Sequence, residues 1–458
     1  MKRAALHNLG CKVNAYETQA MQQMLEEAGY QIVPFQEKAD VYVINTCSVT
    51  NIADRKSRQM LHRAKRLNPD AVIVAAGCYV QAQGPQMQTE GIADIILGNN
   101  KKKHLISMLQ EYEKEAGKYA QYEEEGRNTD SSQGRHAVTA WEDINDGKKQ
   151  YECLKITQTA EHTRAFIKIQ DGCSQFCSYC IIPYTRGRVR SRKAEDILNE
   201  IKILAKKGCR ETVLTGIHIS SYGTDFGFAQ GEGLLRLLGQ IQQIEGIRRI
   251  RLGSLEPGII TEAFAAQLAG MDKICPHFHL SLQSGCDSVL KRMNRRYTTA
   301  EYAMRCEILR KLFDNPAVTT DVITGFPGET EEEFQTTRQF LEKIQFYEMH
   351  IFKYSKRQGT KAAAMDGQIT EAVKAARSAQ LLLLEEQMSA RYREGFTGRT
   401  AEALLEEPFV YNGKEYMSGY TKEYVKIAAE TGKNRANTFI RGKITGHLTG
   451  DIYLMVEF

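Results

Sequence analysis

Three cysteines lie close together in the middle of the chain, in the stretch DGCSQFCSYC. Cys173, Cys177 and Cys180 have the spacing C-x3-C-x2-C and follow a strand-like segment. Clustered thiolates are soft ligands that bind zinc or iron–sulfur clusters. A closed zinc site usually has four protein ligands, whereas a [4Fe–4S] cube held by three cysteines leaves one iron open. The triplet therefore favours an iron–sulfur cluster, and a zinc site completed by a distant ligand is the alternative.

Three further cysteines are dispersed over the first hundred residues. Cys11, Cys47 and Cys78 each follow a short apolar segment, in the contexts NLGC, INTC and AAGC. In an open parallel sheet the carboxyl ends of the strands share one edge, where ligands bind. Neighbouring strands are about 5 Å apart, so we expect the three thiols to converge. The alternative is three unrelated, half-buried cysteines, a common situation for this residue type.

The elements that must position these cysteines follow from the hydrophobic pattern. Residues 1–110 alternate short Val/Ile/Ala-rich strands with amphipathic helices, which predicts a doubly wound parallel sheet and an α/β fold. Residues 111–158 are polar, acidic and repetitive, and we interpret them as a solvated linker. Residues 159–392 predict a (β/α)6 partial TIM barrel, with its chemistry at the carboxyl ends of the strands. Residues 395–458 predict a small β-barrel, with a hairpin turn at Asn412–Gly413.

The six strands expected in the central domain are separated by helical segments. They lie at residues 163–173, 211–220, 249–257, 278–285, 317–328 and 346–355.

Composition narrows the class of protein. The chain has 458 residues, a net charge of +5 and eleven cysteines. This charge permits a nucleic-acid partner without indicating one. No segment approaches the ~20 apolar residues of a membrane span, and the amino terminus lacks a signal-peptide pattern. We therefore expect a cytoplasmic protein with no membrane partner, where clustered cysteines serve as ligands rather than disulfides.

Together with Tyr179, the compact triplet has the form C-x3-C-x-aromatic-C on the first strand–helix loop of the predicted barrel. This pattern resembles the radical S-adenosylmethionine (SAM) enzymes. The resemblance implies that Cys173, Cys177 and Cys180 hold a [4Fe–4S] cluster whose open iron binds SAM. Reduction of that cluster would cleave SAM to a 5′-deoxyadenosyl radical.

Other segments resemble one branch of these enzymes, the methylthiotransferases. The stretches LGCKVNAYET, VINTCSVTNIADRKSR and AAGCYVQ are similar to its amino-terminal domain. HFHLSLQSGCDSVLKRMNRRYT and TTDVITGFPGETEEEF are similar to its central domain, and the last domain looks like its RNA-binding TRAM module. The resemblance implies that Cys11, Cys47 and Cys78 hold an auxiliary [4Fe–4S] cluster at which sulfur is carried.

The motifs LGCKVN and NTCSVTNIADRKSR most resemble the branch that acts on N6-threonylcarbamoyladenosine at position 37 of tRNA. The resemblance implies that one SAM methylates sulfur at the auxiliary cluster. The radical made from a second SAM would remove hydrogen from C2 of the adenine before the C–S bond forms. It also implies an electron donor of flavodoxin type, and the sulfur donor is not indicated.

Three alternatives stay open at this point. Two keep the chemistry and change the acceptor, to isopentenyladenosine in tRNA or to an aspartate of a ribosomal protein. The third is a zinc-containing RNA-binding protein without catalytic activity.

Two sets of supporting residues complete the predicted site. Tyr179 of the cysteine motif is a candidate SAM contact. Polar groups and a glycine at the other strand ends of the barrel are further candidates, although each alone fits a structural role: Thr215, Ser254, Glu256, Gln283 and Gly325. Arginines that follow Cys47 and the compact triplet are candidate RNA contacts, with a solvated surface as the alternative: Arg55, Arg58, Arg186, Arg188 and Arg190.

Overall fold

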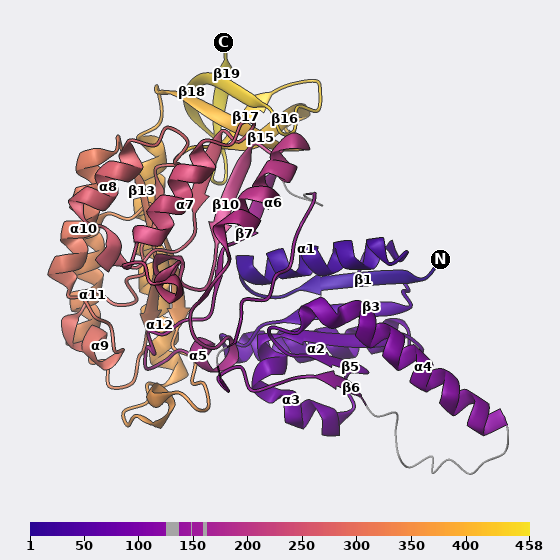
Figure 1. The fold of residues 1–458 in the computed structure, drawn as a ribbon. Helices are drawn as coiled ribbons and strands as arrows, with labels where there is room; N and C mark the ends of the chain where they lie inside the picture. Colours follow the sequence, from indigo (N-terminus) through magenta and orange to yellow (C-terminus); the bar gives the residue numbers. More distant parts are fainter. Residues whose placement is uncertain (125–136, 148, 159–162) are drawn as a thin grey trace. The chain divides into compact units, whose positions relative to one another are not determined.

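The computed structural model describes residues 1–124, 137–147, 149–158 and 163–458 (Figure 1). The chain divides into two compact units, each built from separate segments. Unit 1 comprises Met1–Thr157, Gln170–Arg192 and Ser355–Thr360. Unit 2 comprises Gln158–Ile169, Lys193–Tyr354 and Lys361–Phe458. Within the described residues, no helix is long and apolar enough to cross a membrane.

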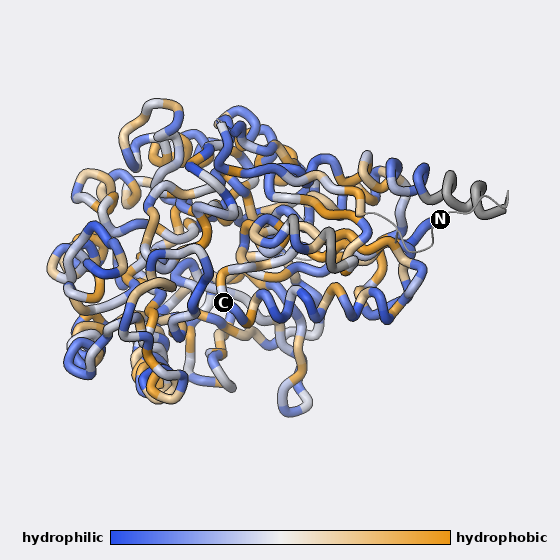
Figure 2. Tube along the Cα trace, turned by 90° about the horizontal axis from the view of Figure 1, so that it is seen from below, coloured by the Kyte–Doolittle hydropathy of each residue, from blue (hydrophilic) through white to orange (hydrophobic). Residues whose placement is uncertain are grey.

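Unit 1 is built on a parallel sheet with the strand order β2-β1-β3-β4-β5-β6. The strands are β1 (Arg3–Asn8), β2 (Gln31–Ile32), β3 (Val41–Thr46), β4 (Val72–Gly77), β5 (Ile95–Leu97) and β6 (Val138–Ala140). The helices of this part are α1 (Lys12–Glu27), α2 (Asn51–Leu67), α3 (Cys78–Glu90) and α4 (Leu105–Glu124), with a 3-10 turn at Lys102–His104. Hydrophobic and hydrophilic stretches alternate along the trace, as expected for strands buried between amphipathic helices (Figure 2).

Helices cover both faces of this sheet. Leu61 of α2 and Met87 of α3 belong to one apolar core. Met21 of α1 and Leu109 of α4 belong to another core. Strand β3 contributes Ile44 to the first core and the adjacent residue Val43 to the second. Because successive strand residues point to opposite faces, the two cores lie on the two sides of the sheet. The prediction of a doubly wound parallel sheet is confirmed.

The predicted linker over residues 111–158 needs correction. Helix α4 continues to Glu124, and its Tyr112 is buried in the core. Strand β6 pairs in parallel with β5, and Trp141 donates a hydrogen bond to the Gln81 carbonyl at 3.2 Å. The described parts of this stretch as far as Thr157 therefore belong to unit 1, and residues 125–136 and 148 lie outside the described residues.

Unit 2 contains the six expected strands as an open parallel barrel. They are β7 (Arg164–Lys168), β10 (Glu211–Thr215), β11 (Arg249–Leu252), β12 (His277–His279), β13 (Ala317–Thr324) and β14 (Glu348–Lys353). They form two three-stranded runs, and a parallel bridge between Leu255 and Leu280 joins β11 to β12. The helices are α6 (Ala194–Lys206), α7 (Glu232–Gln242), α8 (Glu262–Ala269), α9 (Asp287–Arg292), α10 (Thr299–Leu312), α11 (Glu331–Ile344) and α12 (Glu371–Glu394). Short 3-10 turns lie at Ile219–Ser221, Thr224–Phe226, Pro257–Ile259 and Lys361–Ala364.

The carboxyl-terminal residues form the predicted small β-barrel, closed in the order β15-β16-β17-β19-β18. Its strands are β15 (Thr400–Tyr411), β16 (Lys414–Thr421), β17 (Lys426–Glu430), β18 (Phe439–Thr449) and β19 (Ile452–Glu457). Asn412 and Gly413 both have positive φ, 49° and 76°. This is the backbone that a two-residue hairpin of type I′ requires, so the turn expected there is confirmed.

A buried ion network ties the two parts of unit 2 together. Arg249 and Arg251 are both buried and flank the carboxylate of Glu211, which accepts a hydrogen bond from Arg251 Nε at 2.8 Å. Arg249 donates to the Tyr420 carbonyl at 2.8 Å, and Arg251 donates to the Lys422 carbonyl at 3.0 Å. Burial alone would raise the pKa of the Glu211 carboxyl, but the arginines lower it below its ordinary value.

We predict that Glu211→Gln destabilises unit 2 by about 3 kcal/mol, because it removes the carboxylate that pairs with buried Arg251 at 2.8 Å and leaves buried Arg249 with only Glu402 at 3.5 Å. The depressed pKa means that the Glu211 contribution is present at neutral pH and is lost as the pH falls through the folded-state pKa. At pH 7 the thermal unfolding midpoint of Glu211→Gln should therefore be lower than that of wild type. The difference between the two midpoints should shrink at low pH. Glu430→Gln is the control, since this exposed carboxylate pairs with exposed Lys414 outside the buried network and should lower the midpoint much less. Equal midpoints for the two variants at pH 7 would contradict the prediction.

Candidate functional site

The three dispersed cysteines follow three neighbouring strands of unit 1. Cys11 lies between β1 and α1 as the N-cap of that helix, Cys47 directly follows β3, and Cys78 directly follows β4 as the first residue of α3. Strands β1, β3 and β4 are consecutive and parallel in the sheet. Their carboxyl ends therefore bring the three cysteines to one edge of the sheet, the arrangement that strand order alone predicts.

Two glycines allow the backbone to pass close to these thiols. Gly10 has a φ of +106°, and a Cβ built on it would lie 2.9 Å from Cys47 Sγ. Gly77 has a φ of +99°, and its Cβ would lie 2.4 Å from the Thr46 carbonyl oxygen. Any other residue would be strained at both positions and would push on the neighbouring strand end. The glycines of NLGC and AAGC are therefore part of the site.

The cysteine residues of this triplet differ in exposure. Cys47 and Cys78 are buried, whereas Cys11 is exposed. Burial raises the pKa of the Cys47 thiol to about 12, and the neighbouring Cys78 and Cys11 contribute in the same direction. In the absence of a metal the Cys47 thiol therefore keeps its proton, and binding of a metal cluster must displace this proton. Three sulfur donors at one sheet edge fit a soft-metal cluster that leaves one position open.

Arg186 supplies a buried positive charge beside Cys78. Its Nε lies 3.2 Å from Cys78 Sγ, and its Nη atoms donate to Glu17 at 2.9 and 3.1 Å and to Asp171 at 3.1 Å. A further bond of 2.6 Å reaches Asn14 Oδ1. Burial alone would lower the pKa of this guanidinium, but the sulfur and the two carboxylates raise it well above its ordinary value. Arg186 therefore stays charged and can stabilise a thiolate at Cys78.

A second cation and an amide complete the polar shell. Asn99 Nδ2 lies 3.6 Å from Cys78 Sγ, and Asn99 Oδ1 accepts a hydrogen bond from Lys102 Nζ at 2.6 Å. Lys102 is fully buried and also pairs with Glu17 at 3.2 Å. Cys78 thus has two nitrogen donors near its sulfur, which suits a thiolate ligand better than a neutral thiol.

The compact triplet is held in a closed loop of the same unit. Strand β8 (Gln170–Asp171) pairs with β9 (Arg190–Ser191), and helix α5 (Ile182–Thr185) lies between them. The Cys173 amide donates to the Gly187 carbonyl at 2.9 Å, and the Cys180 amide donates to the Cys177 carbonyl at 3.0 Å. All three cysteines are half-buried. Three half-buried thiols on a loop whose two ends are paired fit a cluster with one exposed iron.

Gly172 shows how tightly this loop is packed. Its φ is +71°, and a Cβ at this position would lie 1.9 Å from the Arg188 carbonyl oxygen. Only glycine is compatible with that approach, which explains the DGC sequence before the first cysteine. Tyr179, the aromatic residue of the motif, is half-buried.

A late segment of the chain secures the Cys47 loop. Arg357 donates to Ser48 Oγ at 2.8 Å, to Asn51 Oδ1 at 2.7 Å and to Asp54 Oδ2 at 2.6 Å. It is buried, although it lies some 300 residues from its partners in the sequence. Sequence reasoning missed this arginine, because no local pattern links it to the cysteine.

Sequence reasoning also missed the acidic and amide groups around Arg186. Glu17, Asn14 and Asn99 lie in ordinary helical or loop contexts, and Asp171 and Lys102 have no motif that marks them. The only sequence signal for Glu17 and Asn14 is their spacing of three on α1, which places both on one helix face shortly after Cys11.

The candidate SAM contacts lie at or just beyond strand ends in unit 2. Thr215 is the last residue of β10 and is buried, and Ser254 follows β11 and is exposed. Gln283 follows β12 and Gly325 follows β13. Their placement at one end of a parallel barrel is the position expected of ligand contacts, and their role stays a prediction.

Three of these positions have distinctive surroundings. Glu256 accepts bonds of 2.9 Å from Arg295 to both its oxygens and lies 3.5 Å from His218 Nε2. Gln283 has a φ of +75°, unusual for a residue other than glycine. Gly325 also has a positive φ, +70°, and a Cβ there would lie 2.3 Å from Lys374 Cγ.

The candidate RNA-binding arginines divide into two groups. Arg55 and Arg58 on α2 and Arg188 in the cysteine loop are exposed, and Arg188 lies over the ring of Phe176 at 4.2 Å. Arg186 and Arg190 are buried and lie against Asp171 instead. The prediction of an RNA contact for these two residues is therefore corrected, because their guanidinium groups are held inside unit 1.

Arg186→Met should lower the stability of unit 1 by about 3–5 kcal/mol, because it leaves the buried carboxylates of Glu17 and Asp171 without their main cation. Arg188→Met is the matched control from the same loop, and its exposed side chain should cost less than about 1 kcal/mol. Thermal unfolding of the two cluster-loaded variants measures the difference. Similar midpoints for both would contradict the role of Arg186 as a buried counter-ion.

Comparisons with known proteins agree with this geometry. A family model described as uncharacterized protein family UPF0004 matches residues 3–98, and the radical SAM superfamily model matches residues 167–341. The structure of the radical SAM methyltransferase TsrM from Kitasatospora setae superposes with a TM-score of 0.52. That alignment has 15% identity and covers 79% of this chain and 74% of that one, so it supports the fold alone.

Full-length relatives are more informative. The threonylcarbamoyladenosine tRNA methylthiotransferase MtaB of Bacillus subtilis is 41% identical, over 97% of this chain and 94% of that protein. MtaB of Aquifex aeolicus is 38% identical, over 88% and 93%. The tRNA-2-methylthio-N(6)-dimethylallyladenosine synthase of Desulfosudis oleivorans is 34% identical, over 96% and 90%. With both cysteine triplets in place and this similarity along nearly its whole length, the chain belongs to the radical SAM tRNA methylthiotransferases.

Proposed function

We propose that this protein adds a methylthio group to C2 of N6-threonylcarbamoyladenosine at position 37 of tRNA. The observation that carries the proposal is the presence of two cysteine triplets in one compact unit, one at a sheet edge and one on a closed loop. Three threonylcarbamoyladenosine enzymes are 41%, 38% and 34% identical to this chain, and the dimethylallyladenosine enzyme of Desulfosudis oleivorans is 34% identical, so the two higher identities both belong to the first class. This difference supports the choice of substrate.

Each triplet would hold one [4Fe–4S] cluster. Cys11, Cys47 and Cys78 offer three thiolates to the auxiliary cluster, and Cys173, Cys177 and Cys180 offer three to the cluster that binds SAM. When bound, these clusters and SAM supply sulfur transfer, methyl transfer and radical chemistry. The donor set fits, because soft thiolates on three-ligand sites leave one coordination position for a further ligand.

The residues of the chain position and shield this chemistry. Arg186 holds a positive charge against Cys78 while its other nitrogens are fixed by two carboxylates. Arg357 fixes the loop that carries Cys47. In unit 2, Thr215, Ser254, Glu256, Gln283 and Gly325 present polar or backbone groups at strand ends, where they would contact SAM.

Recognition of tRNA would use exposed positive charge. Arg55, Arg58 and Arg188 are exposed on the surface of unit 1 and can contact phosphates. The small β-barrel is the second candidate RNA surface. Two of its tyrosines are unsuited to base stacking, since Tyr420 and Tyr424 stack on each other at 4.5 Å and Arg164 lies over both rings. A flavodoxin-type electron donor and a cytoplasmic location belong to the same proposal.

Nucleoside mass spectrometry of tRNA tests the substrate. In a deletion strain, 2-methylthio-N6-threonylcarbamoyladenosine should disappear and its unmodified precursor should accumulate. The wild-type gene should restore it and Cys78→Ala should not, because one auxiliary ligand is lost. Cys153→Ala is the control, since this exposed cysteine lies outside both triplets and the variant should restore the product.

Other outcomes would overturn the proposal in distinct ways. Loss of the methylthiolated isopentenyladenosine, or of a methylthiolated ribosomal-protein aspartate, would assign a different acceptor. Purified protein that contains zinc but neither iron nor acid-labile sulfide would exclude the enzyme altogether.

A further inference from the structure

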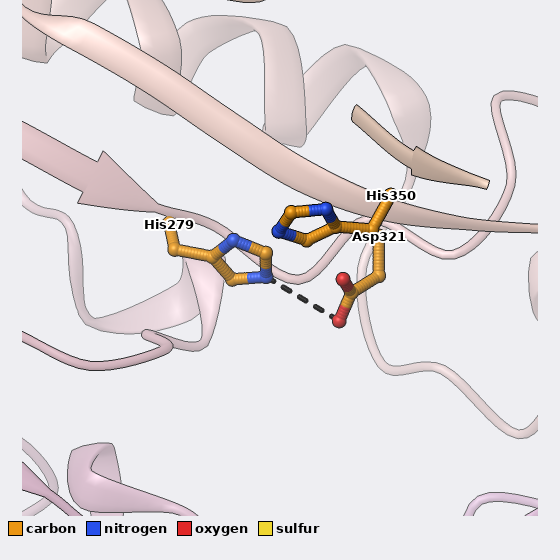
Figure 3. A group of neighbouring side chains, drawn as sticks. All are labelled: His279, Asp321 and His350. Atoms are coloured by element: carbon orange, nitrogen blue, oxygen red, sulfur yellow. Dashed lines mark ion pairs between the residues drawn. The ribbon is translucent and has the colours of Figure 1, made fainter. Parts of the chain in front are cut away.

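A third group of metal-ligating side chains lies in unit 2, away from both cysteine triplets in the sequence. His279 on β12, Asp321 on β13 and His350 on β14 come from three adjacent strands. One ligand atom from each lies within 4.8 Å of the other two, and the three side chains point toward one another (Figure 3). Among the described residues, it is the one group of three potential ligands in which all ligand atoms lie this close together.

The strand register places the three side chains on one face of the sheet. Asp321 pairs directly with His350, and His279 pairs with Thr319, two residues before Asp321. The opposite face of β13 carries Thr320, whose hydroxyl donates to the Leu280 carbonyl, an oxygen that also accepts from Tyr302 of helix α10. Because alternate residues point to opposite faces, the cluster lies on the face turned away from α10, the interior of the open barrel.

The separation of His279 and Asp321 suits two ligands of one metal ion better than a hydrogen bond. His279 Nε2 is buried and lies 3.3 Å from Asp321 Oδ2, yet it makes no hydrogen bond to any described residue. Two ligand atoms at the ~2.0–2.1 Å bond lengths of a tetrahedral zinc are separated by about 3.3 Å. The observed separation therefore equals the one that a common metal ion would impose.

The other ring nitrogen of His279 is already fixed. Nδ1 lies 3.0 Å from the hydroxyl of Thr319, which is buried. Metal-binding histidines use such an outer contact to set the tautomer and the ring orientation. The ring of His350 stacks on that of His279 at 5.8 Å and is exposed, so a ligand can reach the site from that side.

We propose that His279, Asp321 and His350 form a binding site for a divalent transition-metal cation of the zinc type. Two imidazoles and a carboxylate are ligands that zinc accepts. Three protein ligands leave a fourth position for water or for an oxygen atom of a bound molecule. Its ligand set differs from those of the two cysteine triplets, because it contains no sulfur donor.

Zinc loading of the cluster-containing enzyme tests this site. The anaerobic, iron-loaded protein is titrated with Zn²⁺, freed of unbound metal by gel filtration, and analysed for zinc and iron per chain. Wild type should retain about one zinc more than Asp321→Asn or His350→Ala, with unchanged iron. Thr319→Val should bind the same zinc ~10–100-fold more weakly, because it removes only the outer contact. His447→Ala, which removes an exposed histidine of the small barrel, should behave as wild type.

X-ray absorption at the zinc edge identifies the ligands. The account predicts nitrogen and oxygen neighbours at ~2.0–2.2 Å and no sulfur shell at ~2.3 Å. Three results would overturn the proposal: no zinc retained by wild type, equal zinc in wild type and both ligand variants, or a sulfur-dominated shell from occupation of a cysteine triplet. Because His350 is exposed, its variant should fold normally, and its unchanged iron content would verify this.

Discussion

The architecture of unit 1 depends on one topological constraint: parallel strands that are neighbours in a sheet end at the same edge. Strands β1, β3 and β4 are such neighbours, and each is followed at once by a cysteine. No local motif is needed to bring residues 11, 47 and 78 together, because the hydrogen-bonded register does so. The strand ends are tightly packed as a result, and only glycine fits at Gly10 and Gly77.

Electrostatics then link this edge to the second triplet. A buried guanidinium is costly unless it is paired, and Arg186 is paired with Glu17 of α1 and Asp171 of the cysteine hairpin. It also lies beside Cys78, where it would balance a thiolate ligand. The segment that carries Cys173, Cys177 and Cys180 is thereby part of the same compact unit as the N-terminal sheet. One side chain thus serves both triplets.

Much of this could be predicted from the sequence. Val/Ile-rich segments alternating with amphipathic helices predicted the parallel sheet and all six barrel strands, because strand and helix periodicities differ clearly. The linker prediction failed because the acidic composition after residue 111 outweighed the helical spacing of Leu105, Met108, Leu109 and Tyr112, which are buried. Strand β6 has only three residues, too few for a pattern to show.

The polar part of the site was much harder to predict. In the run RGRVRSRK, composition cannot tell Arg186, which is fully buried, from Arg188, which is exposed. That difference depends on partners such as Glu17, which lies 169 residues earlier. Arg357 and the His279, Asp321 and His350 cluster likewise depend on contacts between distant segments. Sequence patterns report periodicity and local chemistry, whereas pairing of distant charges requires the fold.

The most direct measurement is the amount of iron and acid-labile sulfide per chain in anaerobically reconstituted protein. Wild type should contain about eight irons, from two four-iron clusters. The triple variant Cys11→Ala, Cys47→Ala, Cys78→Ala should contain about four, and so should the triple variant of Cys173, Cys177 and Cys180. An iron content that does not fall in the first triple variant would contradict the central claim that three strand ends build a cluster site.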